Sequence, residues 1–146
     1  MSYALSITLD VHFNEAVSRI TTALTQQGFE MLTAVDLQEV LKEKAGAVVP
    51  RQLLMGVLRP QLAVDALRVE PSMALLILSN VSILEINQDR TYIEIFDPSV
   101  AIGLTNNAAL QPIVEEACRR LSVALASLTE IREKLPREEA DPAPAT

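Results

Sequence analysis

The chain begins with a strict alternation of apolar and polar positions. From Tyr3 to Phe13 every odd-numbered position holds a large apolar side chain, and most positions between them are polar. A period of two is typical of a strand that buries one face. We therefore expect a half-buried strand here, with His12, the single histidine, on its polar side.

Helical spacing follows. Between Asn14 and Gly28 apolar residues recur every three or four positions, which predicts a covering helix capped by Asn14 and ended by Gly28. Asp36, followed three residues later by Glu39, has the spacing of a capping box and predicts the start of a second helix, which Gly46 ends. The segment between the two helices is strand-like.

The centre of the chain consists of two apolar runs on either side of a segment that opens with a proline. Residues 53–58 and the run that starts at Met73 have strand lengths, whereas Pro60 to Val69 has helical spacing. We expect strand, helix and strand. A polar turn at residues 87–90 then leads into a further strand, Thr91 to Phe96, as a hairpin.

A long helix is predicted from Pro112 to Leu135, because its apolar residues alternate steps of three and four, as in a heptad seam. Leu128 and Ile131 continue the seam toward the end of the helix. We expect a homodimer or larger closed homo-oligomer in which this stripe or an apolar edge of the sheet pairs with a second copy of the chain. The rival interpretation is that the helix crosses the sheet diagonally and the stripe is core.

The predicted order is strand, helix, strand, helix, strand, helix, strand, strand, helix. This order predicts an α+β fold in which helices pack on one face of a mainly antiparallel sheet. At 146 residues the chain is long enough for one core, so we expect a single domain over residues 1–135. Residues 136–146 are rich in Pro, Ala and acidic side chains, which predicts a disordered tail.

Composition excludes several kinds of partner. A net charge of -7 and an aromatic content of 3% argue against nucleic acid. The longest uninterrupted apolar run, Met73 to Leu78, is far below the roughly 20 residues that cross a bilayer, so we expect no membrane span. Cys118 is the only cysteine, which fits a reducing cytoplasm. One cysteine and one histidine favour neither a metal site nor a bound cofactor.

Between residues 5 and 130 the chain resembles the bacterial domain-of-unknown-function 302 family. The resemblance implies a compact α+β fold and commonly a homodimer, with no established reaction. The residues that carry it are Val35, Asp36, Leu37, Glu43, Lys44, Ala45, Gly46, Leu54, Gly56, Pro60, Leu62, Ala63, Ala66, Leu67, Glu70, Pro71, Leu75, Leu76, Asn80, Val81, Asp97 and Pro98.

Two departures from the family pattern concern its chemistry. Where the family typically has Cys-Asn-Pro, this chain has Leu58, Arg59 and Pro60, and where it typically has Pro-Cys-Asn-Val, residues 78–81 read Leu-Ser-Asn-Val. Both family cysteines are therefore absent. A thiolate before a helix N-terminus would suit redox, sulfur or metal chemistry, and Leu58 cannot supply it. Ser79, at the second position, is unactivated unless a base stands beside it.

We weigh two functions. The favoured one is a homo-oligomeric, non-enzymatic module that binds a partner or a small ligand. The alternative is a small-molecule-binding protein or enzyme built on the polar residues left by the resemblance. These candidate ligand-binding residues are Asp36, Lys44, Ser79, Asn80 and Asp97. Each also has a structural role available: for example, Asp36 can cap a helix, and Asp97 before Pro98 can start a turn.

Overall fold

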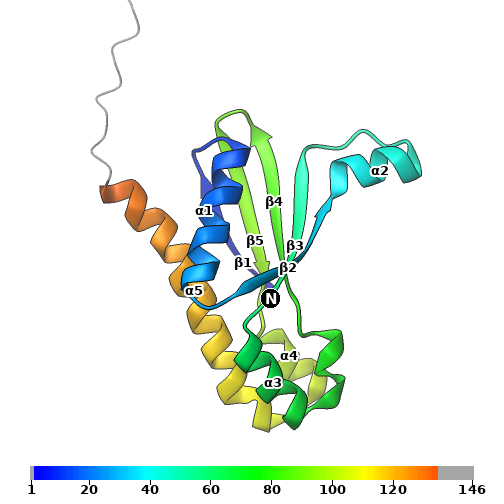
Figure 1. The fold of residues 1–146 in the computed structure, drawn as a ribbon, viewed down its shortest axis with the longest axis vertical. Helices are drawn as coiled ribbons and strands as arrows, with labels where there is room; N and C mark the ends of the chain where they lie inside the picture. Colours follow the sequence, from blue (N-terminus) through cyan, green and yellow to red (C-terminus); the bar gives the residue numbers. More distant parts are fainter. Residues whose placement is uncertain (1, 135–146) are drawn as a thin grey trace, which may run out of the picture.

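The computed structural model describes residues 2–134, with side chains described as far as Thr129. One five-stranded sheet, in which all neighbouring strands are antiparallel, runs in the order β1-β5-β4-β3-β2 (Figure 1). The strands are β1 (Ala4–Leu9), β2 (Glu30–Asp36), β3 (Gln52–Leu58), β4 (Ser79–Asn87) and β5 (Arg90–Phe96). The helices are α1 (Phe13–Gln26), α2 (Leu37–Ala45), α3 (Pro60–Val69), η1 (Pro71–Leu75), α4 (Val100–Thr105), η2 (Ala108–Leu110) and α5 (Gln111–Lys134).

The core lies between one face of this sheet and the helices α1 and α5. Val81 and Ile83 of β4 pair with Ile95 and Ile93 of β5, and all four side chains are completely buried. Strand residues that alternate in this way place one face in the core and the other toward water. The α+β class, the antiparallel sheet and the predicted order of the nine elements are confirmed, and the structure adds α4 and the two short helices.

The predicted first strand is too long. β1 ends at Leu9, which pairs with Thr91 at the start of β5, so residues beyond Leu9 have no further partner in the ladder. The chain turns into α1, and His12 rather than Asn14 is the N-cap: its Nδ1 accepts a hydrogen bond from Asn14 N at 3.2 Å. His12 therefore has a structural role at a helix start.

The strand predicted to begin at Met73 begins later, because residues 73–78 are not part of a strand. Its first part lies in η1, and β4 begins only at Ser79, opposite Val57 near the end of β3. Because β3 turns into α3 after Leu58, residues 73–78 have no strand to pair with. Met73 packs instead in a second, smaller cluster with residues of α3, α4 and α5.

Leu128 of α5 is buried in the main core and only 1% exposed. The interpretation of the seam as core therefore holds at this position, and the pairing of copies through Leu128 was wrong. α5 crosses the sheet beside α1 (Figure 1), which hides Leu128 within one chain. The side chain of Ile131, residue Leu135 and the predicted tail over residues 136–146 lie outside the described part of the chain.

Gly56 in β3 is buried beside an irregularity in β2, where the register shifts between Met31 and Thr33. A Cβ atom at Gly56 would overlap Thr33 Oγ1 and lie 3.3 Å from Leu78 Cδ1. The close approach of the two strands therefore depends on a residue without a side chain.

We expect Gly56→Ala to lower the free energy of unfolding by about 1–3 kcal/mol, because the added methyl group overpacks the β2–β3 contact. The double variant Gly56→Ala with Thr33→Ala should recover most of the loss, since it removes the overlapping oxygen. Gly103→Ala is the control, because a Cβ there meets no atom within 4 Å. Urea unfolding measures all three, and equal stability of Gly56→Ala and wild type would contradict the packing argument.

Candidate functional site

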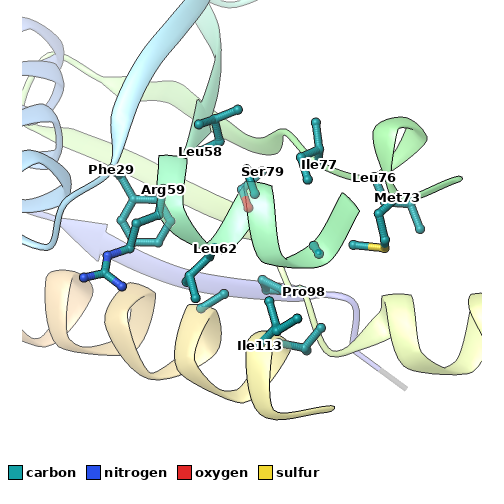
Figure 2. A pocket seen from close by; sticks show the side chains of 14 residues that line it. Phe29, Leu58, Arg59, Leu62, Met73, Leu76, Ile77, Ser79, Pro98 and Ile113 are labelled. Carbon is teal, nitrogen blue, oxygen red and sulfur yellow. The ribbon is translucent and has the colours of Figure 1, made fainter. Parts of the chain in front are cut away.

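A small cavity of about 60 Å³ lies at the end of the sheet where α3 packs beside α5 (Figure 2). Its walls come from segments that are far apart in the sequence: the end of β3, α3, η1, the start of β4 and the first turns of α5. All lining side chains are apolar except those of Arg59 and Ser79. The lining residues are Phe29, Leu58, Arg59, Leu62, Ala63, Ala66, Met73, Leu76, Ile77, Ser79, Pro98, Ile113, Val114 and Ala117.

Leu58 and Ser79 meet at this cavity because the β3–β4 ladder ends with the pair Val57 and Ser79. The two positions at which the family resemblance places cysteines are thus neighbours in space. Among the described residues, the Ser79 hydroxyl has no hydrogen-bond partner. The cavity lining contains no His, Asp or Glu that could act as its base, so the hydroxyl is suited to hydrogen bonding rather than to nucleophilic attack.

Arg59 precedes α3 at the edge of the cavity. It is the N-cap residue, makes no side-chain capping hydrogen bond, and is followed by Pro60 in the first turn. The N–H groups of the first turn therefore lack the side-chain acceptor that Asn or Ser would supply. The absence of such a cap lowers the stability of a helix by about 1 kcal/mol. Among the described residues, the Arg59 guanidinium has neither a hydrogen bond nor an ion pair.

Gly28 positions the Arg59 side chain. A Cβ atom at Gly28 would lie only 2.9 Å from Arg59 Nε, so the arginine passes directly over the glycine backbone. Gly28 also has a φ of 82°, and Phe29 N donates to Leu24 O at 3.0 Å, as expected at the end of α1. In Figure 2 the Arg59 stem runs beside the Phe29 ring, and its charged end lies at the margin of the group.

Asp97 and Cys118 form a pair next to the cavity, since each adjoins a lining residue in the sequence, Pro98 and Ala117 respectively. Asp97 Oδ1 accepts hydrogen bonds from Ser99 N at 2.9 Å and from Cys118 Sγ at 3.4 Å. Burial, followed by the Asp97 hydrogen bond and charge, raises the pKa of the Cys118 thiol to about 11. Burial acts to raise the pKa of Asp97 as well, but the hydrogen bonds from Ser99 and Cys118 outweigh it and hold that pKa below its ordinary value.

The five residues predicted to bind a ligand lie in three places. Ser79 lines the cavity, and Asp97 lies beside it in the predicted turn before Pro98. Asn80 is the next residue along β4 and is exposed on the opposite face of the sheet, across from Gly56.

Asp36, at the end of β2, and Lys44, on α2, lie at the other end of the molecule (Figure 1). Asp36 caps α2, accepting from Glu39 N at 3.1 Å as the capping box predicts, and Lys44 is exposed in the last turn. Within one chain, therefore, the structure does not bring Lys44 together with Asp97, because β2 leads α2 away from the body of the protein.

Sequence reasoning missed most of the cavity, including its single charged residue. The available signal was Arg59 itself, since an arginine occupies a position before Pro60 where a capping side chain is expected. The part of the chain described by the structure holds no group of three His, Cys, Asp or Glu side chains that could bind a metal ion. None of its described helices is both long and apolar enough to cross a membrane.

We expect Cys118 to be alkylated slowly by iodoacetamide, with a rate that keeps rising up to about pH 11 instead of levelling near the ordinary thiol pKa of 9.0. Asp97→Asn should lower the thiol pKa and speed the reaction at pH 8, because it removes a neighbouring negative charge. Cys118→Ser should leave stability nearly unchanged. Mass spectrometry across pH measures the rates, and a plateau at or below pH 9 in the native protein would contradict the expectation.

Comparison with known proteins gives the chain a family. A family model described as Domain of unknown function DUF302 matches residues 5–128. A crystal structure of an uncharacterized conserved protein DUF302 from Bacillus stearothermophilus has a TM-score of 0.79 and 22% identity, covering 86% of this chain and 98% of that chain. At this identity the likeness shows the fold alone, and no curated protein matches the chain. Because the model spans most of the sequence, as the resemblance predicts, the chain belongs to the DUF302 family.

Proposed function

We propose that this chain is a non-enzymatic module that pairs with a second copy of itself through residues 30–50, the arm formed by β2, α2 and the loop that follows. The observation that carries the proposal is an arm whose residues the rest of the described chain leaves largely exposed. All seven residues of β2 are exposed, and α2 has no buried residue.

The arm has well-formed local structure. β2 is paired with β3 along one side, Asp36 and Gly46 cap α2 at its two ends, and Gln38 Nε2 donates to Val49 O at 3.1 Å. An isolated helix of nine residues is nevertheless marginal in water, because most helix stability in proteins comes from packing of an apolar face. The local hydrogen bonds alone therefore do not account for a stable α2, which favours a covering surface from outside the chain.

Apolar side chains on the arm face solvent. Val48 is 96% exposed, Leu32 54% and Met31 49%, and Val35, Val40 and Leu41 are also exposed. A cluster of this kind is typical of an interaction surface rather than of a free monomer surface. Val35 and Val40 have the spacing of a hydrophobic staple around the Asp36 cap, yet both side chains are exposed and open to contact by a partner.

Charge supports a second copy as the partner. α2 has the acidic residues Asp36 and Glu39 at its start and the basic residues Lys42 and Lys44 in its last turn, with Glu43 between them. Two such helices related by a two-fold axis perpendicular to them run antiparallel, so the acidic start of each meets the basic end of the other. An isologous contact of this kind buries the same patch on both subunits and is the commonest symmetric solution.

The outer edge of β2 adds to this surface. Among the described strands β2 is the last in the sheet and has a neighbour on one side only, so the backbone N–H and C=O groups of its other side can accept a strand from another chain.

We also place the module in the cytoplasm, because a chain with one cysteine needs no oxidising compartment.

We expect the wild type to have twice the 16.0 kDa chain mass by light scattering. Val40→Glu with Leu41→Glu should give a folded monomer, because two charges would be buried in the arm contact. Leu75→Glu and Leu104→Glu are matched controls, since these side chains are 88% and 66% exposed outside the arm. Both controls should stay dimeric.

Circular dichroism reports whether each variant is folded. A wild type that is monomeric at every concentration contradicts the proposal, as does a folded arm variant that remains a dimer.

A further inference from the structure

We propose that the cavity between α3 and α5 is a binding site for a short aliphatic carboxylate, with the alkyl chain inside and the anionic end at Arg59. The site lies at the end of the molecule away from the arm (Figure 1), so the inference stands independently of self-assembly. It rests on three properties of the cavity: its apolar interior, the chemistry of its polar groups and its size.

The interior suits a hydrocarbon. Leu62 and Ile113 lie on the α5 side of the cavity in Figure 2, and Met73, Leu76 and Ile77 lie on the side away from Arg59. These side chains offer a ligand no hydrogen-bonding group. A polar or charged ligand end placed among them would lose its hydration without compensation, whereas an alkyl chain gains by leaving water. The alkyl end of the ligand therefore belongs on this side.

The polar groups at the cavity are suited to an acceptor. Arg59 supplies guanidinium donors that have no protein partner among the described residues. Ser79 supplies a hydroxyl that likewise has no partner among them. The start of α3 adds first-turn N–H groups without a side-chain cap, which carry the positive end of the helix dipole. All three features favour a negatively charged ligand end, although the whole chain carries a net charge of -7.

Of the described cations next to the cavity, Arg120 has an ion-pair partner and Arg59 has none. Arg120 reaches Gln27 Oε1 at 3.5 Å, close to Gly28, but it is paired with Glu116 at 2.8 Å. The Asp97 carboxylate, next to the lining residue Pro98, is held by Ser99 and Cys118. A ligand carboxylate is therefore repelled by Asp97 and attracted by Arg59, which favours binding with its anionic end at Arg59.

The size limits the ligand to a small one. A cavity of about 60 Å³ provides roughly four to six water-sized positions. Butyrate, with its six heavy atoms, is near this limit, and longer chains would have to displace side chains. The combination of an apolar interior with a cationic edge disfavours a short alkylammonium ion, which has a similar alkyl chain and the opposite charge.

The test titrates the full-length protein with butyrate, butan-1-ol and butylammonium at matched ionic strength, following the methyl signals of Leu62, Ile113 and Val114 by NMR. We expect saturable shifts from butyrate at these methyl groups. Butylammonium should bind at least about tenfold more weakly, because a charge-assisted hydrogen bond is replaced by repulsion.

Arg59→Gln should weaken butyrate about tenfold and leave butan-1-ol unchanged. Arg68→Gln is the matched control, since it removes the same charge from an exposed position later in α3 and should have little effect. Ala63→Leu, which fills the cavity, should weaken both ligands, and thermal melts check that each variant is folded. Arg59→Gln keeps the test decisive if Ala63→Leu does not fold.

Three outcomes overturn the proposal: no saturable butyrate shift at the cavity, equal affinity for butyrate and butylammonium, or equal losses in Arg59→Gln and Arg68→Gln. The arm variant Val40→Glu with Leu41→Glu should bind butyrate like the wild type. Failure of dimerisation and failure of ligand binding are therefore separate results.

Discussion

Pairing of β4 with β5 at the centre of the sheet is the interaction on which the other elements depend. It aligns Val81 with Ile95 and Ile83 with Ile93 on one face, which α1 and α5 cover. The other face of the same strands has polar groups such as Ser82, whose hydroxyl accepts a hydrogen bond from Gln52 at 2.8 Å. A sheet that buries one face in this way needs only one layer of helices.

The same arrangement explains why both ends of the molecule have unusual surfaces. The one helical layer is supplied by α1 and α5, so α2 has no place in it and extends with β2 from the sheet edge. At the other end β3 stops at Leu58, and α3 must pack against α5 beyond the sheet. The cavity lies in that junction, where helix meets helix without a strand between them.

Much of the fold could be predicted because local patterns report local structure. The glycines Gly28 and Gly46 end their helices in the left-handed conformation, and Asp36 caps α2, as their positions predict. The errors arose where the outcome depends on a distant segment. The residues near Met73 carry no signal that β3, the strand they would pair with, ends before it reaches them. Likewise, the alternation in the first segment continues through His12, although β5 offers a partner only as far as Leu9.

The candidate site was less accessible from the sequence for the same reason. Ser79 could be singled out, but its surroundings come from Phe29, Arg59 and residues of α5 that no spacing rule connects. The resemblance also selected Lys44, which lies on α2 at the other end of the molecule, because a shared pattern does not say which of its residues lie together in space. Only the three-dimensional arrangement separates Lys44 from Ser79.

α5 also belongs to two separate packing units. Leu121 and Leu128 lie in the main core, whereas Leu110, just before the helix, and Val114 lie in the smaller cluster with Ala66 and Met73. The smaller cluster has few buried side chains, so α3, η1 and α4 form a unit that can open while the sheet remains intact. In amide hydrogen exchange this unit would be the less protected foldon, and the first turns of α5 would exchange with it rather than with the rest of their own helix.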